Sequence, residues 1–277
     1  MNNVTIFKRI LKSPSGISGV VIVLTYIIIA SLAPLVAPYD PLAMHPADRL
    51  TSPNSRFLAG TDQFGRDMLS RILFGARTSL YFAFASVGIA TLIGGLLGTA
   101  MGYIGGILDS LVMRVVDIML SFPPLILALS LVAFLGSGPS NIIIALAVTY
   151  TPIFTRMARG PAIPLKEREF VQASIAAGAG LLRIIFKHIL PNVIPLIIIQ
   201  SSLALSWAIL TEAALSFLGL GVQPPTPSWG AMLGEGRRFM IAAPWLAVFP
   251  GIAITIIVIG FNLLGDGLRD ILDPRLR

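Results

Sequence analysis

The sequence predicts an all-α membrane protein with six membrane-spanning helices. Charged residues make up only 12% of the 277 residues, hydrophobic residues make up 55%, and the mean hydropathy is +0.86. Soluble domains carry about 25% charged residues. With so little charge available, much of the protein surface has to face lipid rather than water.

Stretches without charged residues place the six spans, because about 20 apolar residues are needed to cross the hydrocarbon core. The turn sequence GSGPSN at residues 136–141 divides the longest such stretch into two helices. The first span is longer than the apolar part of a signal peptide, so we expect it to remain as a helix. The predicted spans are 17–37, 79–103, 118–135, 141–157, 192–218 and 246–264.

The distribution of Lys and Arg indicates that the N-terminus and the C-terminus both face the cytoplasm. With this orientation most of the basic residues lie on the cytoplasmic side, and the arginines of segment 38–78 are the main exception. The same bias explains the net charge of +7 without a nucleic-acid partner. The segments expected inside are 1–16, 104–117, 158–191 and 265–277, with Lys8, Arg9, Lys12, Arg275 and Arg277 near the two ends.

The residue inventory argues against catalysis and against a metal site. The chain has no Cys, which excludes disulfides and thiolate ligands, and its two histidines are far apart in the sequence. It also has no Gly-Lys pair, which a phosphate-binding P-loop requires. We therefore expect no catalytic residues, no metal ligands and no cofactor bound by this chain.

The segment 158–191 is predicted to contain two short amphipathic helices. The first, at 165–177, is expected to begin after Pro164, and the second lies at 181–189, after the helix-breaking sequence GAG at 178–180. Such a pair either rests on the lipid surface or presents a helix to a groove on a partner protein.

This segment resembles the EAA loop through which ABC importer permeases contact their ATPase subunits. Gly178, Leu190 and Pro191 are in register with that motif. The chain departs from it by having Gln172, Ser174 and His188 where the motif has Glu, Ala and Ile. Because Gln172 is uncharged, a salt bridge that needs Glu at this position is not implied. The resemblance assigns ATPase coupling to Gln172, Ala173, Ser174, Gly178, His188, Leu190 and Pro191.

Four further blocks resemble the C-type permeases of ABC importers for dipeptides, oligopeptides and nickel. Together with the EAA-like loop they span nearly the whole chain in order. The blocks are GTDQFGRD at 60–67 followed by GARTSL at 75–80, LSFLGLG at 215–221, PPTPSWG at 224–230, and GDGLRD at 265–270 with LDPR at 272–275.

The resemblance implies a permease subunit in a prokaryotic cell (inner) membrane that imports di- or oligopeptides. It implies a first helix with an extracytoplasmic segment at 1–78, and a five-helix permease core at 79–277 whose coupling loop is 158–191. The implied partners are a homologous B-type permease, two cytoplasmic ATPase subunits that bind ATP and Mg, an extracytoplasmic substrate-binding protein and membrane lipid.

Three polar residues of the fifth span are candidates for the pathway: Glu212, Ser206 and Gln200. A carboxylate inside a membrane usually faces a cavity or a partner. For Glu212 we favour the alternative that it is solvated near the interface or pairs with Arg237 or Arg238. For Ser206 and Gln200 the alternative is a hydrogen bond between helices.

The outer loop 219–245 contains two candidates for a lid over the pathway, Pro225 and Trp229. Anchoring at the membrane interface would also explain Trp229, as it would Trp245. Elsewhere, Pro123-Pro124 is expected to kink the third span, and Arg114 to pair with Asp117 three residues on. The glycines at 94, 98, 102 and 106 form a small-residue face that is expected to pack against another helix, and Gly106 falls beyond the predicted end of the span at 103.

Two other classes of protein were weighed against an ABC permease. An ion-coupled secondary transporter usually shows inverted repeats and ionisable groups at mid-membrane, but no repeat is evident and Glu212 is the only embedded acid. A membrane enzyme would need an assembled set of reactive residues, which the sequence does not contain. Import of nickel or another small solute by the same architecture remains open.

Overall fold

The computed structural model describes residues 13–272, and within them the chain is built from α-helices. The one β-type contact in this described range is an isolated antiparallel bridge between Thr61 and Asp67. Five helices are long and apolar enough to cross a membrane, and a sixth span results if a bent pair of helices counts as one. The predicted fold class is confirmed. The basic residues at 8, 9, 12, 275 and 277 lie outside the described range.

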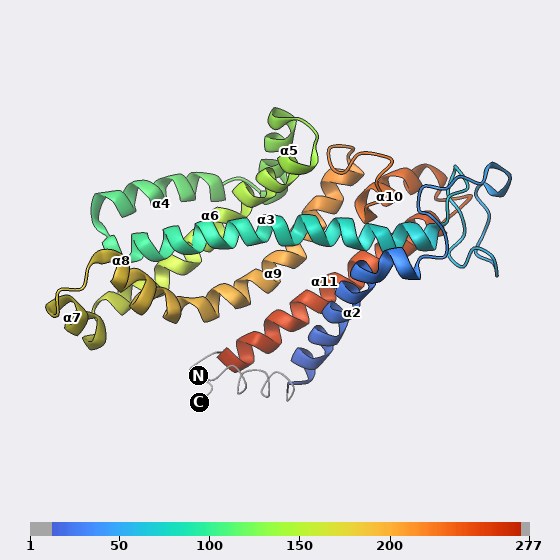
Figure 1. Cartoon of the computed structure of the whole chain (residues 1–277). Coiled ribbons are helices and arrows are strands. Elements are labelled where there is room, and N and C mark those ends of the chain that lie inside the picture. Colours follow the sequence, from blue (N-terminus) through green and yellow to red (C-terminus); the bar gives the residue numbers. More distant parts are fainter. Residues whose placement is uncertain (1–12, 273–277) are drawn as a thin grey trace.

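Helices α2 (Pro14–Val36) and α11 (Trp245–Leu272) form an antiparallel pair at one side of the bundle (Figure 1). Glycines bring the two backbones together. A Cβ atom on Gly19 would lie 2.3 Å from the Leu264 nitrogen, and one on Gly267 would lie 2.4 Å from the Gly16 Cα. The beginning of α2 and the end of α11 are therefore at the same end of the bundle.

Helix α3 (Met68–Ile104) is the long central helix of the bundle. Its 37 residues correspond to about 55 Å, well beyond a hydrocarbon core of about 30 Å. Asp67 caps its first turn by accepting a hydrogen bond from the Ser70 N–H at 2.7 Å. The predicted span 79–103 lies within α3, but the helix itself begins earlier, at Met68. A helix this long continues beyond the hydrocarbon core, and Arg71 and Arg77 lie in its additional part.

The third span is a broken helix rather than the kinked helix predicted at 118–135. Helix α4 (Gly106–Leu120) and helix α5 (Pro124–Leu135) meet at an angle of 93°. Pro123 and Pro124 have no N–H groups to donate, so the helical hydrogen bonds do not continue from α4 into α5. Gly106 is the first residue of α4 and lies past the end of α3, as expected.

Two ion pairs hold α4 against α6 (Pro139–Lys166). Asp109 accepts two hydrogen bonds of 2.6 Å from Arg159, and Asp117 pairs with Arg156. The predicted pair of Asp117 with Arg114 on the same helix is therefore wrong. An arginine on a facing helix can reach the carboxylate while the two backbones pack side by side.

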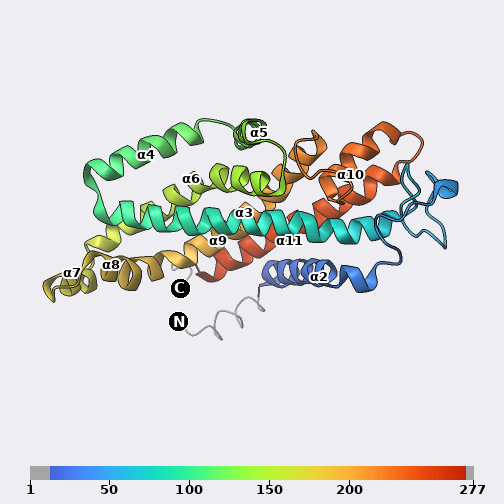
Figure 2. The same ribbon diagram turned by 45° about the horizontal axis from the view of Figure 1, so that its top comes forward.

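Helix α6 (Pro139–Lys166) packs along α3 (Figure 2). The small-residue face of α3 makes this possible. A Cβ atom on Gly94, Gly98 or Gly102 would lie within 2.1–2.7 Å of atoms in α6, whereas Gly106 has no neighbour within 4 Å. The prediction that these glycines serve helix packing is confirmed for the first three.

Helix α6 also continues through Pro161 and Pro164 to Lys166, so the prediction that Pro164 opens a new helix is wrong. Pro164 cannot donate to the carbonyl of Gly160, four residues earlier. Gly160 is exposed, so the missing hydrogen bond falls on the surface of the helix and not on its packed face. A proline near a helix end therefore does not have to mark a boundary.

The predicted second amphipathic helix, at 181–189, is not a separate element but the beginning of a longer helix. Helix α8 (Leu181–Ile184) passes through a π-helical turn, η2 (Ile185–Ile189), into α9 (Leu190–Phe217). The Leu190 N–H bonds to the Ile185 carbonyl five residues back. This wider turn carries the helix past Pro191, so Leu181–Phe217 is one span of 37 residues.

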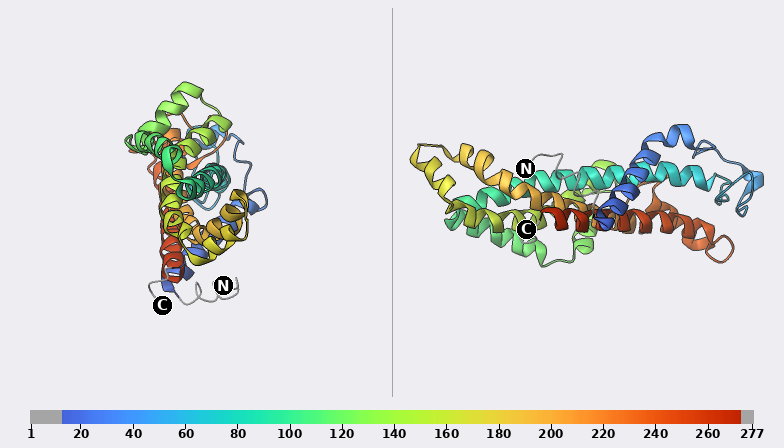
Figure 3. Two further views of the ribbon diagram at one scale, coloured as in Figure 1. Left: turned by 90° about the vertical axis from the view of Figure 1, so that its left-hand side faces the viewer. Right: turned by 90° about the horizontal axis from the view of Figure 1, so that it is seen from below.

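The two ends of the bundle differ in structure (Figure 3). One end carries a hairpin, residues 167–189, made of α7 (Glu169–Ala176), α8 and η2. The other end carries a cap, made of residues 38–67 with η1 (Pro46–Asp48), the loop 218–228, α10 (Trp229–Gly236) and η3 (Arg237–Phe239). The main apolar core lies between them, where α3, α6, α9 and α11 meet.

Candidate functional site

The hairpin is shaped by one glycine and a small apolar core. Gly178 ends α7 with φ of +80°, a left-handed conformation in which glycine has no side-chain clash. Val171 on α7 and Ile184 on α8 are buried against Ala158 and Ala162 of α6. The hairpin is therefore packed onto the end of the bundle instead of hanging from it as a loop.

Polar contacts add to this attachment at the positions that resemble the EAA motif. The Gln172 amide donates a 2.8 Å hydrogen bond to the carbonyl of Lys166 at the end of α6. Ser174 Oγ lies 3.0 Å from His188 Nε2, which ties α7 to η2. The neutral Gln172 thus has a role that an ionised Glu cannot perform, because a carboxylate has no N–H to donate.

The outward side of the hairpin is apolar. Phe170, Leu182 and Phe186 are 45%, 68% and 53% exposed, and Ala173 on α7 is exposed as well. Arg168, Glu169, Arg183 and Lys187 are exposed around them. Leu190 and Pro191 begin α9 beneath the hairpin. An apolar helical surface with a charged rim has the character of a protein docking surface.

A groove of about 460 Å³ lies between α5, α6 and α9, beside the break at Pro123 and Pro124. Gln200 and Trp207 line it from α9, and the Trp207 side chain is 63% exposed. On its wall the Tyr150 hydroxyl lies 2.9 Å from Thr211 Oγ1, joining α6 to α9. The groove is mostly apolar and carries a few hydrogen-bonding groups, as pockets for small ligands do.

Of the three pathway candidates, Gln200 lines this groove and the other two do not. Ser206 is buried and donates a 3.2 Å hydrogen bond to the Val258 carbonyl, which links α9 to α11. Glu212 is fully buried and accepts a 2.7 Å hydrogen bond from Ser216.

The expectation that Glu212 is solvated or paired with Arg237 or Arg238 is wrong. No ion pair to Glu212 occurs in the part of the chain that the structure describes, and its second oxygen, Oε2, has no hydrogen-bond partner there. The reason is the loop after α9, which folds back over this carboxylate instead of leaving it at the surface. The Val222 N–H, for example, donates to Ser216 Oγ at 3.0 Å.

The lid candidates lie in this cap. Pro225 is exposed in the loop before α10. Trp229, by contrast, is fully buried, and its indole N–H donates a 3.0 Å hydrogen bond to the Ile72 carbonyl of α3. Trp245 likewise donates to the Thr61 carbonyl at 3.1 Å. Full burial excludes anchoring at the membrane interface for Trp229, and the N–H groups of both tryptophans are used inside the protein to fasten the cap.

A buried ion network forms the centre of the cap. Asp62 accepts a 2.6 Å hydrogen bond from Arg66 and lies 3.5 Å from Arg71. Glu235 of α10 accepts from the same two arginines at 3.2 and 3.4 Å. The arginine side chains are only 3% and 2% exposed. The network joins segment 38–67, α3 and α10 into one unit.

Sequence reasoning did not identify this network, nor Tyr150 and Trp207 in the groove. A signal for the network existed, because Asp62 and Arg66 are four residues apart and Glu235 is the one acid in segment 219–245. Tyr150 and Trp207 gave no such signal, since aromatic residues in apolar helices usually face lipid or core.

The fold and these three regions define a polytopic helical membrane protein with an apolar hairpin surface at one end, a polar cap at the other and a groove between them. Comparison with known proteins is consistent with that class. Residues 90–277 match the family model described as binding-protein-dependent transport system inner membrane component. Residues 4–53 match the model described as N-terminal TM domain of oligopeptide transport permease C.

Curated relatives match over nearly the full chain. The dipeptide transport system permease protein DppC of Alkalihalophilus pseudofirmus is 46% identical, with 98% of this chain and 89% of the relative covered. The glutathione transport system permease protein GsiD of Pectobacterium atrosepticum is 42% identical, with coverages of 98% and 90%. The di/tripeptide transport system permease protein DppC of Pseudomonas aeruginosa is 45% identical, with coverages of 95% and 88%.

The chain therefore belongs to the family of inner-membrane permeases of ABC importers, in its C-type group. Members of this family are multi-pass membrane proteins that act as one component of a transporter complex. The family is one of transport components rather than catalysts.

Proposed function

We propose that this chain forms half of the translocation pathway of an ATP-driven importer for di- or oligopeptides. A homologous B-type permease would supply the other half, and an extracytoplasmic binding protein would deliver the peptide. Two cytoplasmic ATPase subunits would bind ATP and Mg, since the chain has no P-loop. Support for the peptide substrate comes from two relatives of 46% and 45% identity, which are named as dipeptide and di/tripeptide permeases.

The observation that carries this proposal is the continuity of one long helix. Residues 181–217 run without a break from the hairpin, past the groove, to the residues that hold the cap. A helix of 37 residues is about 55 Å long and transmits a displacement along its axis. A push on the hairpin by an ATPase subunit would therefore reach the groove and the cap directly.

Alternating access then follows from how α9 is attached to its neighbours. Among the described residues, few hydrogen bonds join α9 to the other helices: Tyr150 to Thr211, Thr91 to Ser201 at 3.2 Å, and Ser206 to the Val258 carbonyl. Sliding of α9 against α5 and α6 would change the width of the groove beside Gln200. In the orientation that Lys and Arg favour, the hairpin faces the cytoplasm and the cap faces outside.

Other substrates and another energy source are the alternatives. The relative named as a glutathione permease is 42% identical, and the same architecture would serve nickel or another small solute. An ion-coupled secondary transporter would need an ionisable group that faces the pathway. Glu212 is buried and does not line the groove, which favours an ATP-driven importer over an ion-coupled transporter.

Replacing Ala173 with Trp is predicted to reduce ATPase co-purification with the importer complex by about tenfold, an effect of ~1.4 kcal/mol. Ala173 is exposed on α7 beside the apolar surface of the hairpin. An indole at this position would keep α7 from entering a close-fitting groove on the ATPase subunit. The measurement is the ATPase-to-permease ratio after affinity purification from membranes.

The matched control is Ile241→Trp, which adds an indole at a fully exposed position between η3 and α11, at the opposite end of the bundle. This variant should retain the normal amount of ATPase. Equal ATPase ratios in the Ala173 variant and the unaltered complex, with both assembled, would remove the hairpin from the coupling mechanism.

A further inference from the structure

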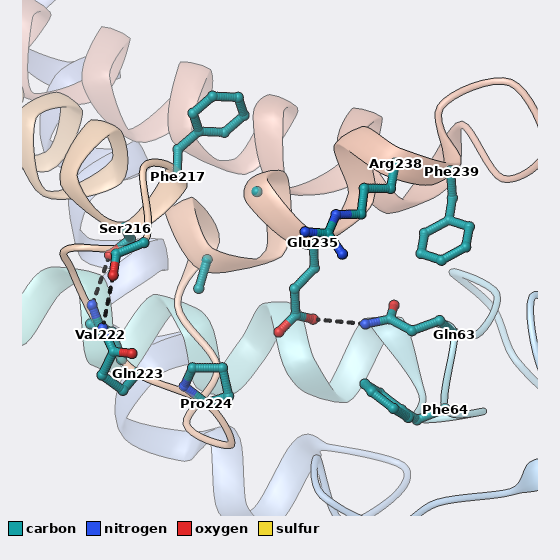
Figure 4. Close-up of a pocket in the computed structure, with 13 residues that line it drawn as sticks. Gln63, Phe64, Ser216, Phe217, Val222, Gln223, Pro224, Glu235, Arg238 and Phe239 are labelled. Carbon is teal, nitrogen blue, oxygen red and sulfur yellow. Dashed lines mark hydrogen bonds between the residues drawn. The ribbon is translucent and has the colours of Figure 1, made fainter.

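A second cavity, of about 390 Å³, lies in the cap and is separate from the groove (Figure 4). Three aromatic side chains contribute to its walls: Phe64 from segment 38–67, Phe217 from the end of α9, and Phe239 from η3. Phe64 and Phe217 are 44% and 38% exposed. The size and the aromatic lining are those of a pocket for a small organic ligand.

The charges around this cavity do not balance. Glu235 and Arg238 are the charged residues that line it. The Glu235 carboxylate, however, already accepts hydrogen bonds from Arg66 and Arg71, which also share Asp62. These two acids and two arginines neutralise one another. What remains at the cavity is the positive charge of Arg238.

Arg238 has no acidic partner of its own. No ion pair or hydrogen bond from its guanidinium occurs among residues 13–272, and the residue is exposed. Figure 4 shows its guanidinium apart from the Glu235 carboxylate, which turns toward Gln63. Its neighbour Arg237 is placed differently, with its guanidinium 5.4 Å from the centre of the Phe217 ring. Only Arg238 of the two lines the cavity.

A hydrogen-bond acceptor completes the lining. Gln223 uses its amide N–H₂ group to donate to the carbonyls of Gly219 and Gly221, at 3.1 and 3.0 Å. This leaves its amide oxygen free to accept, since no hydrogen bond to that oxygen is present in the described part of the chain. The cavity thus offers a cation, a neutral acceptor and apolar walls.

We propose that this cavity is a binding site for short peptides with a free C-terminal carboxylate. Arg238 binds the carboxylate, Gln223 accepts an N–H from the peptide, and the phenylalanine rings contact its side chains. The assignment rests on the proposed peptide import and adds a site on the permease itself, before the groove. Guanidinium–carboxylate pairing is charge-assisted and bidentate, which makes it selective for the free carboxylate over its amide.

The test uses the purified importer complex without its binding protein. Saturation-transfer NMR measures binding of the dipeptide Ala-Phe and of its C-terminal amide to the unaltered complex and to variants. The variants are Arg238→Gln, Arg238→Lys and, as the matched control, Arg56→Gln, which removes an exposed arginine of the cap that does not line the cavity. We expect Arg238→Gln, or amidation of the peptide, to weaken binding by about tenfold, and the lysine variant to lose less because it keeps the charge. The control should bind normally.

Equal binding of the acid and the amide, or equal binding by the unaltered complex and Arg238→Gln, overturns the proposal. So does a result in which Arg238→Gln leaves Ala-Phe binding intact but weakens docking of the binding protein, because Arg238 then meets an acidic group on that protein. ATP-driven uptake of Ala-Phe by the unaltered complex with its binding protein is measured in parallel. If the unaltered complex with its binding protein shows no uptake, peptide import itself is refuted. If uptake is normal but no peptide binds at the cap, only this site is refuted.

Discussion

Replacing Gly98 with Ala is expected to lower the free energy of unfolding by about 3 kcal/mol. The added Cβ atom would lie 2.1 Å from the carbonyl oxygen of Thr155 and 3.0 Å from the Ala158 Cβ on α6. A backbone oxygen in a neighbouring helix cannot rotate away, so α3 and α6 would have to separate along the most extensive helix contact in the protein. The measurement is the unfolding free energy from SDS titration in mixed micelles.

Gly88→Ala is the matched control, since it makes the same change in the same helix. A Cβ atom on Gly88 would meet no atom within 4 Å. Alanine is the better helix former by up to ~1 kcal/mol, so this variant should be unchanged or slightly more stable. If the two variants lost the same stability, close packing of α3 on α6 would not be what these glycines provide.

Removal of the Glu235 carboxylate is expected to cost about 3 kcal/mol of stability, because breaking a buried ion network leaves charge without compensation. In Glu235→Ala, the buried Arg66 and Arg71 would share the single carboxylate of Asp62. Their repulsion should loosen α10 from segment 38–67. Unfolding in SDS, together with faster hydrogen exchange in α10, measures the effect.

An exposed ion pair in the same segment provides the comparison. Arg56 lies 3.1 Å from Asp48 and its side chain is 57% exposed, so Arg56→Ala should change stability by no more than ~1 kcal/mol. Combining Glu235→Ala with Arg71→Met removes one of the two uncompensated cations and should restore part of the lost stability. A Glu235 variant that behaved like the Arg56 variant would mean that the network does not hold the cap together.

The spans were predictable because lipid imposes a rule that the sequence must obey. Hydrocarbon does not solvate charge, so charge-free stretches mark what crosses it. The rule says nothing about helix that continues into water. It therefore missed the first part of α3, where Arg71 is buried in an ion network, and the part of α6 that passes Pro161 and Pro164.

The hairpin was predictable in part for a similar reason. Gly178 has a backbone conformation that glycine favours, and this produces a recognisable break after α7. The π turn that joins α8 to α9 has no residue signature, because it depends on hydrogen-bond spacing rather than on side-chain type. Sequence reasoning therefore gave two separate helices where one continuous helix links the hairpin to the cap.

The cap was the least predictable region, because its contacts join residues that are distant in the sequence. Glu212 is covered by a loop that returns to Ser216, and Trp229 bonds to a carbonyl of α3. Each residue alone, a membrane acid or a tryptophan near a span end, fits several environments equally well. Both residues are buried because of contacts with residues that come close only when the chain is folded.

We propose that ATP hydrolysis by partner subunits drives import through a pathway that this chain helps to form. The direct test is uptake of labelled Ala-Phe into proteoliposomes that contain the complex and the binding protein, with ATP supplied on the hairpin side. We expect uptake that requires ATP and is lost in Ala173→Trp, with no uptake driven by a proton or sodium gradient alone. Uptake driven by an ion gradient without ATP, or by this chain reconstituted without an ATPase, would contradict it.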